Sequence, residues 1–240
     1  MPMDSGKAEI SKSLSDGEVC KKRRLRKLAY WLLIDLSVAV LIIGLLVHRP
    51  GRYSPARPAP LRRGEVHPYL IELSSQFNNG TQYRKPFEIA IDQQKINEVV
   101  ALGNWPIESQ GILLYAPAVL FEPGVVVLMG TADIRGVELI VTIEIQPRIN
   151  DKGLLNLHVA TVKVGAMNIT PIAKMIARTM YAERVAVMSV DMKDFRTKIA
   201  ASLLNEEAFD PVFTAEDKKA RLLNVTIVKG RLTARLAPAP

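Results

Sequence analysis

The stretch VVVLMGTADIRGVELIVTIEIQP (125–147) decides the fold, because apolar or small residues recur at every second position on both sides of Arg135–Gly136. Side chains two residues apart lie on the same face of a β-strand. A two-residue turn at Arg135–Gly136 therefore predicts a long β-hairpin in which Ile134 lies opposite Val137. One face of this hairpin is apolar, and something else has to cover it.

Further segments with a period of two predict more strands. FEIAI (87–91) is a short alternating strand, and AVLFE (118–122), which is bracketed by prolines, predicts an edge strand. Residues 154–165 predict a third long strand, antiparallel to the second, with a bulge near Ala160 that curves the sheet. The chain closes with a strand or hairpin about Lys229–Gly230.

Helical patterns lie between these strands. Residues 68–77 have apolar residues at helical spacing before a turn at 78–80, and Asp92 can cap the next helix. Thr170–Pro171 starts an amphipathic helix, and another is expected around 191–207. The predicted fold is α+β, a long curved antiparallel β-meander packed on amphipathic helices, preceded by one N-terminal transmembrane helix.

Residues 28–47 (LAYWLLIDLSVAVLIIGLLV) predict the transmembrane helix, since they extend about 30 Å at helical rise, the thickness of a bilayer's hydrocarbon core. The basic segment KKRRLRK (21–27) favours a cytoplasmic N-terminus and an extracytoplasmic C-terminal domain. No small-residue cleavage site follows before residues 48–50, so an uncleaved single-pass anchor is favoured over a signal peptide.

The expected organisation has four regions: a disordered basic cytoplasmic tail (1–27), the transmembrane helix (28–47), a Pro/Arg-rich linker (48–66) and an extracytoplasmic α+β domain (67–240). The formal net charge of +8 comes from the tail and the linker, because acidic and basic residues nearly balance after residue 65. Nucleic acid is therefore not an expected partner, whereas the membrane lipid bilayer is.

Residues that most enzymes use are scarce in the sequence. It has one cysteine and three histidines, and it lacks G-x-S-x-G, H-E-x-x-H and a Gly-rich phosphate loop. His158 is interpreted as an exposed strand residue. Asp133 and Glu138 would face each other across the hairpin, which favours a different register or a cation such as Arg135 over a metal ion. We expect no enzyme, no cofactor and no metal site.

The anchor, the segment FEIAIDQQKINEVVAL (87–102), the hairpin, and NLHVATVKVGAMNITP (156–171) before a helix together resemble the YpmS-like membrane-anchored proteins of bacterial envelopes. Their order is also similar to bacterial relatives of the tubular lipid-binding fold. The matching residues are Ile91, Asp92, Ile96, Asn97, Gly130, Val228, Lys229 and Gly230. The resemblance implies a non-catalytic domain outside a bacterial inner (cytoplasmic) membrane that holds an acyl chain between sheet and helix.

Two interpretations of the apolar face stay open. In the first, a bound acyl lipid contacts the inward residues of the strands and of the helix after Pro171. These are Val126, Leu128, Ala132, Ile134, Val137, Leu139, Val141, Ile143, Ile145, Leu157, Val159, Ile172, Met175, Ile176 and Met180. Few aromatics, small residues at 130 and 132, and pliable methionines favour this interpretation.

In the second interpretation the helix fills the face and leaves a fully packed core without a ligand. The domain is then an envelope scaffold that binds a protein partner by strand addition or through its Met-rich helix. The opposite hairpin face also carries apolar residues, namely Val125, Val127, Met129 and Ile140. These fit a partner site or a second helix packed behind the sheet.

Overall fold

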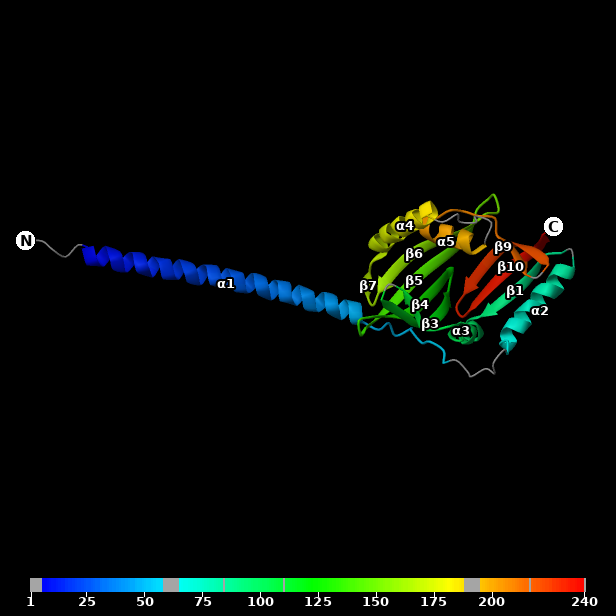
Figure 1. The fold of residues 1–240 in the computed structure, drawn as a ribbon, viewed down its shortest axis with the longest axis horizontal. Coiled ribbons are helices and arrows are strands. Elements are labelled where there is room, and N and C mark those ends of the chain that lie inside the picture. The colour runs from blue at the N-terminus through cyan, green and yellow to red at the C-terminus, as the bar shows by residue number, and fades with distance from the viewer. Residues whose placement is uncertain are drawn as a thin grey trace, which may run out of the picture. The chain divides into compact units, whose positions relative to one another are not determined.

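The computed structural model describes residues 6–57, 65–83, 85–109, 111–187, 195–215 and 217–239, and it has five helices and ten strands within them (Figure 1). The chain divides at Leu45/Leu46 into an N-terminal helical unit and a second compact unit. All strands belong to the second unit and are antiparallel to their neighbours. The predicted α+β class with one apolar N-terminal helix is confirmed.

Helix α1 (Gly6–Val47) contains the expected apolar span. Its part Lys27–Val47 is long and apolar enough to cross a membrane, which fits a membrane anchor or a signal sequence. The prediction of a disordered tail is wrong for residues 6–27, which continue the same helix. Alanine, leucine, lysine, arginine and glutamate in this segment favour a helix, and no proline interrupts it. Residues 1–5 lie outside the described residues.

The first sheet has six strands in chain order, as a meander requires. The strands are β2 (Ile107–Ser109), β3 (Ile112–Glu122), β4 (Val125–Ile134), β5 (Val137–Ile149), β6 (Leu155–Val164) and β7 (Met167–Asn168). The predicted hairpin register is confirmed, because Ile134 pairs with Val137. Arg135 and Gly136 both have positive φ, 55° and 86°, as the tight turn between β4 and β5 needs.

Two bulges shape this sheet, and one of them was predicted. Glu144 pairs with Thr161 but Ile145 pairs with Val159, so the extra residue of β6 is Ala160, as expected. The edge strand expected at 118–122 is part of the longer β3. Residues 112–114 of β3 pair with β2, whereas residues 118–122 pair with β4 alone and so form an edge of the sheet. The proline at 117 is tolerated inside the sheet because the β3–β4 register shifts there.

Four strands form a second sheet, which the sequence did not indicate. It contains β1 (Phe87–Asp92), β10 (Arg231–Ala239), β9 (Lys218–Val228) and β8 (Val212–Ala215), in that order. Backbone hydrogen bonds join the two sheets at their turns: Gly124 N donates to Ile227 O, and Gly230 N to Phe121 O, both at 3.0 Å. The final hairpin at Lys229–Gly230 is confirmed.

Four helices flank the sheets, and α4 and α5 lie against β6 (Figure 1). They are α2 (Pro68–Gln82), α3 (Gln93–Ala101), α4 (Thr170–Val187) and α5 (Phe195–Asn205). Asp92 caps α3 as predicted, since its Oδ1 accepts from the backbone N–H groups of Gln94 and Lys95. The predicted α5 segment 191–194 lies outside the described residues.

The predicted turn at 78–80 is wrong, because α2 continues to Gln82. Gly80 lies directly against the ring of Phe87, and a Cβ there would overlap the ring. Close packing of the helix on β1 therefore requires this glycine, rather than a turn.

The chain after α1 is bound to the domain, although residues 48–66 were expected to form a spacer. Arg52 bridges Glu122 and Glu144 at 2.9 and 2.7 Å. The Tyr53 hydroxyl donates to Ala116 O (2.6 Å) and lies 2.8 Å from Thr131 Oγ1. We call residues 49–57 the covering segment; residues 58–64 lie outside the described residues.

The covering segment lies on the outward face of the hairpin. Tyr53 packs against the buried cluster of Ala118, Val127, Met129 and Ile140. Neither a partner nor a further helix is needed to explain why these apolar residues are buried. The Asp133–Glu138 pair is confirmed as well, and the cation beside Glu138 is Arg49 rather than Arg135.

Candidate functional site

An apolar groove of about 610 Å³ lies between the two sheets. It is lined from the first sheet by Val126, Leu128, Ile145, Pro147, Leu155 and Leu157, and from the second by Ile89, Ile91, Phe213, Thr214, Ala215, Leu222, Val225, Leu232, Ala234 and Leu236. Phe77 of α2 and Ile199 and Leu203 of α5 complete the lining. Thr214 is the only one of these described residues with a polar side chain. The groove therefore suits a hydrocarbon far better than a polar ligand.

Strand alternation explains how the second sheet contributes so many apolar side chains. Ile89 and Ile91 are two residues apart on β1, as are Leu232, Ala234 and Leu236 on β10. On β9 the spacing is three, from Leu222 to Val225, because the β9–β10 register shifts beside Leu236. The bulge lets both β9 residues face the groove.

A smaller cavity of about 250 Å³ adjoins the groove. Leu128, Ile145 and Leu203 line both spaces. The remaining lining residues of the smaller cavity are Ile143, Val159, Val162, Ala173, Lys174, Ala177 and Leu204. This cavity lies between the first sheet and helices α4 and α5, which is where the sequence predicted a ligand.

Six of the predicted contact residues line one or both spaces: Val126, Leu128, Ile143, Ile145, Leu157 and Val159. Five others, Ala132, Ile134, Val137, Leu139 and Val141, lie nearer the β4–β5 turn and line neither. Ala132 is fully packed at 4% exposure, whereas Ile134 and Val137 at the turn are 40% and 50% exposed. The site thus occupies the end of the hairpin that is remote from its turn.

The predicted orientation of α4 is wrong. Ile172, Met175 and Ile176 are 55%, 64% and 50% exposed, so they do not cover the sheet. The side chains of α4 that line the cavity are Ala173, Lys174 and Ala177. Small alanines let the helix approach β6 closely, and an apolar stripe alone does not tell which face of a helix packs inward. The side chain of Met180 lies outside the described residues.

Sequence reasoning missed the whole contribution of the second sheet. The signal was present, because Leu232, Ala234 and Leu236 alternate with Thr233 and Arg235, and Ile89 and Ile91 are likewise two residues apart. What the sequence did not indicate is that these strands form a separate sheet facing the first one. Periodicity reports that a strand has an apolar face but not which surface lies opposite.

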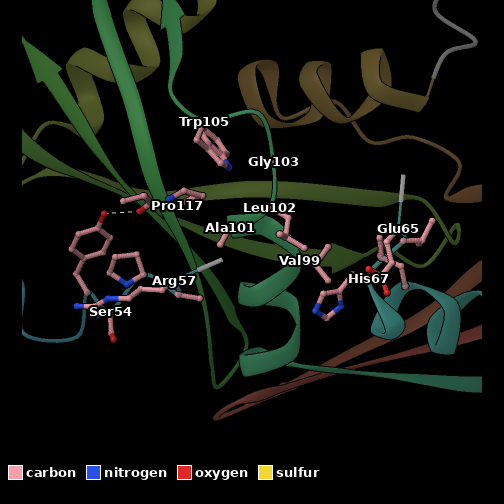
Figure 2. Close-up of a pocket in the computed structure, with 16 residues that line it drawn as sticks. Ser54, Arg57, Glu65, His67, Val99, Ala101, Leu102, Gly103, Trp105 and Pro117 are labelled. Atoms are coloured by element: carbon pink, nitrogen blue, oxygen red, sulfur yellow. Dashed lines mark hydrogen bonds between the residues drawn. The ribbon is translucent and has the colours of Figure 1, made fainter. Parts of the chain in front are cut away.

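A larger hollow of about 1320 Å³ lies on another part of the domain. Figure 2 shows Ser54 and Arg57 on one side of it, His67 and Glu65 on the other, and Ala101 and Leu102 between them. Its lining includes residues on both sides of 58–64, which lie outside the described residues. We assign no ligand to it.

Within the described residues, no group of three or more His, Cys, Asp and Glu side chains is arranged to hold a metal ion. Comparisons of the chain with models of protein families, with curated proteins and with solved structures find no match. The resemblance to YpmS-like proteins and to the tubular lipid-binding fold therefore stays a prediction. The groove is the feature that bears most directly on function.

Proposed function

We propose that the domain formed by residues 66–239 binds the acyl chain of a lipid in the groove between its two sheets. The observation that carries this proposal is the almost completely apolar lining of a cavity of about 610 Å³. Ligand pockets in proteins commonly measure about 300–1,000 Å³ and combine apolar walls with few polar groups. This space supports lipid binding over the alternative of a fully packed core without a ligand.

In this proposal the chain is an uncleaved single-pass protein of a bacterial inner membrane, with its N-terminus in the cytoplasm. The basic residues before the apolar helix and the missing cleavage site support this topology. The domain is non-enzymatic and acts as a lipid-holding module outside the membrane. The scarcity of histidine and cysteine supports a binding role over catalysis.

Photolabelling of the full chain in nanodiscs tests the proposal. A diazirine-bearing fatty acid is added, irradiated, and located by mass spectrometry of peptides. We expect label on the strands around Val225 and Leu232, which line the groove, and not on Val127, which is buried on the other face of the first sheet. The membrane-spanning residues 28–47 serve as an internal reference for fatty acid in the bilayer.

A matched pair of variants on β10 sharpens this test. Ala234 lines the groove, whereas the adjacent Arg235 is exposed on the opposite side of the strand. Ala234→Trp should lower groove labelling about tenfold, equivalent to roughly 1.4 kcal/mol of binding free energy. Arg235→Trp should leave it unchanged. The proposal would be contradicted if the wild type and both variants were labelled equally and only at sites outside the groove.

A second candidate function is protein binding through α4, and the exposure of Ile172, Met175 and Ile176 on one helix favours it. A photo-crosslinking amino acid at Met175 in native membranes should then give one discrete heavier product. The same group at Lys152, an exposed residue of the turn between β5 and β6, is the control. Lipid binding and this role are compatible, because the cavity lies on the other face of the helix.

A further inference from the structure

A charged cluster lies at the edge of the smaller cavity. Lys174 Nζ of α4 donates to Glu206 Oε1 at 2.9 Å, and His158 Nδ1 of β6 lies 3.2 Å from the same oxygen. The three side chains are 31%, 38% and 30% exposed for Lys174, Glu206 and His158. Asn156 Nδ2 donates to the backbone oxygen of Glu206 and so ties the backbone at Glu206 to β6. His158 is thus part of a polar cluster, not merely an exposed strand residue.

Positive charge is concentrated around this single carboxylate. The hydrogen bond from Lys174 lowers the pKa of Glu206; burial opposes this effect, and the charges of Lys174, His158 and Arg178 add to it. Arg178 follows Lys174 by one helical turn, so both cations lie on neighbouring positions of one side of α4. An ammonium group has three N–H donors, and Glu206 Oε1 accepts only one of them.

Lys174 connects this cluster to the apolar space. Among the described residues that line the groove and the smaller cavity, it is the only charged one. Its neighbours in the lining include Ala173, Ala177 and Leu204. The hydrocarbon stem of Lys174 contacts the cavity while its ammonium reaches Glu206 at the edge, as long basic side chains commonly do at apolar boundaries.

We propose that Lys174, assisted by His158 and Arg178, binds the anionic headgroup of a single-chain amphiphile whose tail occupies the adjoining cavities. The headgroup is a carboxylate or a phosphate, and it takes N–H donors of Lys174 that Glu206 leaves open. This inference rests on the proposed lipid binding and specifies the chemical class of the lipid. In this proposal, Glu206 holds Lys174 in position and competes with the headgroup for the Lys174 ammonium.

The test uses the full chain in nanodiscs with two photolabels of equal length, a diazirine fatty acid and the matching diazirine fatty alcohol. Groove labelling is expressed relative to labelling of residues 28–47, which corrects for the amount of each compound in the bilayer. Lys174→Gln should lower relative labelling by the acid about tenfold, since a charge-assisted hydrogen bond is lost, and leave the alcohol unchanged. Glu206→Gln should raise labelling by the acid.

Lys163→Gln is the matched control. Lys163 lies on β6, is 35% exposed and pairs with Glu144 at 3.6 Å, but it does not line either space. Its replacement should change neither label. The Glu206→Gln arm keeps the test decisive if Lys174→Gln disturbs folding, because the two variants are expected to act in opposite directions.

Three outcomes would overturn the headgroup assignment. The first is equal labelling by acid and alcohol in the wild type and in both variants, which leaves lipid binding intact. The second is displacement of the acid by inorganic phosphate, which would make the cluster a site for free anions. The third is absence of groove labelling by either compound in the wild type, which defeats the proposed function as well.

Discussion

The two faces of the six-stranded sheet differ in how tightly their apolar residues are packed. On the outer face, Val127, Ile140 and Thr142 are 0%, 1% and 2% exposed. On the inner face, Leu128 and Ile143 of the same two strands are only half-buried and line the cavity. The outer face also carries the polar residues Thr131, Thr142 and Glu144, so greater hydrophobicity does not explain its tighter packing.

The difference comes from what lies opposite each face. The covering segment brings an aromatic ring onto the outer face, where the Tyr53 hydroxyl donates to Ala116 O and is also hydrogen-bonded to the Thr131 hydroxyl. Opposite the inner face are a second sheet and two helices, which meet it at their turns and edges and leave space between. Whether an apolar face becomes a closed core or a binding site depends on how completely the elements opposite it fill the space against it.

Shortening one isoleucine on each face should give the largest difference in the free energy of unfolding. Ile140→Ala should destabilise the domain by about 2–4 kcal/mol, because it opens a void in a closed cluster. Ile143→Ala should cost less than about half of that, since its side chain already borders a cavity. Urea unfolding followed through Trp105, in a Trp31→Phe background, measures both. Equal losses would contradict the contrast between the faces.

The hydroxyl of Tyr53 should account for a smaller part of the outer packing. Tyr53→Phe keeps the ring but leaves the buried Thr131 hydroxyl and Ala116 O without this partner. We expect a loss of about 1–2 kcal/mol in the same unfolding experiment. Tyr83→Phe, at a 70% exposed tyrosine, should change nothing and serves as the control.

The ion pair of the covering segment predicts a modest dependence of stability on pH. Burial raises the pKa of Glu144, but hydrogen bonds from Arg52 and Thr161 and the charges of Lys163 and Arg52 outweigh it, so the pKa is lowered overall. A carboxyl with a lowered pKa stabilises the fold above its unfolded pKa of about 4.3, and this contribution is lost as pH falls through the lower folded value.

The Arg52→Gln variant should therefore lose less stability than the wild type as the pH falls. The effect should be below about 1 kcal/mol, because both partners are partly exposed and the pair is screened by solvent. Unfolding midpoints measured between neutral pH and about pH 3 test it. An unchanged pH profile in the variant would show that the pair does not bind the covering segment to the sheet.

The smallest expected effect concerns the turn end of the hairpin. A hydrogen bond to Glu138, with burial and the charges of Glu138 and Asp133 adding to it and that of Arg49 opposing it, raises the pKa of Tyr115 to about 12. Glu138→Gln should bring this tyrosine back toward its ordinary value near 10. Alkaline absorbance titration compared with a Tyr115→Phe variant detects the shift.

Local features of the fold could be predicted from the sequence. The hairpin register, the bulge at Ala160, the Asp92 cap and the start of α4 at Thr170 each depend on a few neighbouring residues. Such features are determined by backbone geometry and short-range hydrogen bonds, which residue type and spacing report directly.

Features that depend on distant segments could not be predicted in this way. Gly80 looked like a turn residue, but its role is set by Phe87 on the neighbouring strand. The rotation of α4 depends on how closely Ala173 and Ala177 approach the sheet, and the role of Tyr53 depends on a cluster more than sixty residues away. Half of the candidate site was missed for the same reason, because it belongs to the opposite sheet.

The covering segment has a practical consequence for producing the domain without its membrane helix. Its contacts begin at Arg49, only two residues after α1 ends at Val47. A soluble version that starts after Arg57 would lack the ring that shields Val127 and Met129, and it would expose an adhesive apolar surface on the back of the sheet. Versions that start at His48 retain this shield and are the ones we expect to stay monomeric.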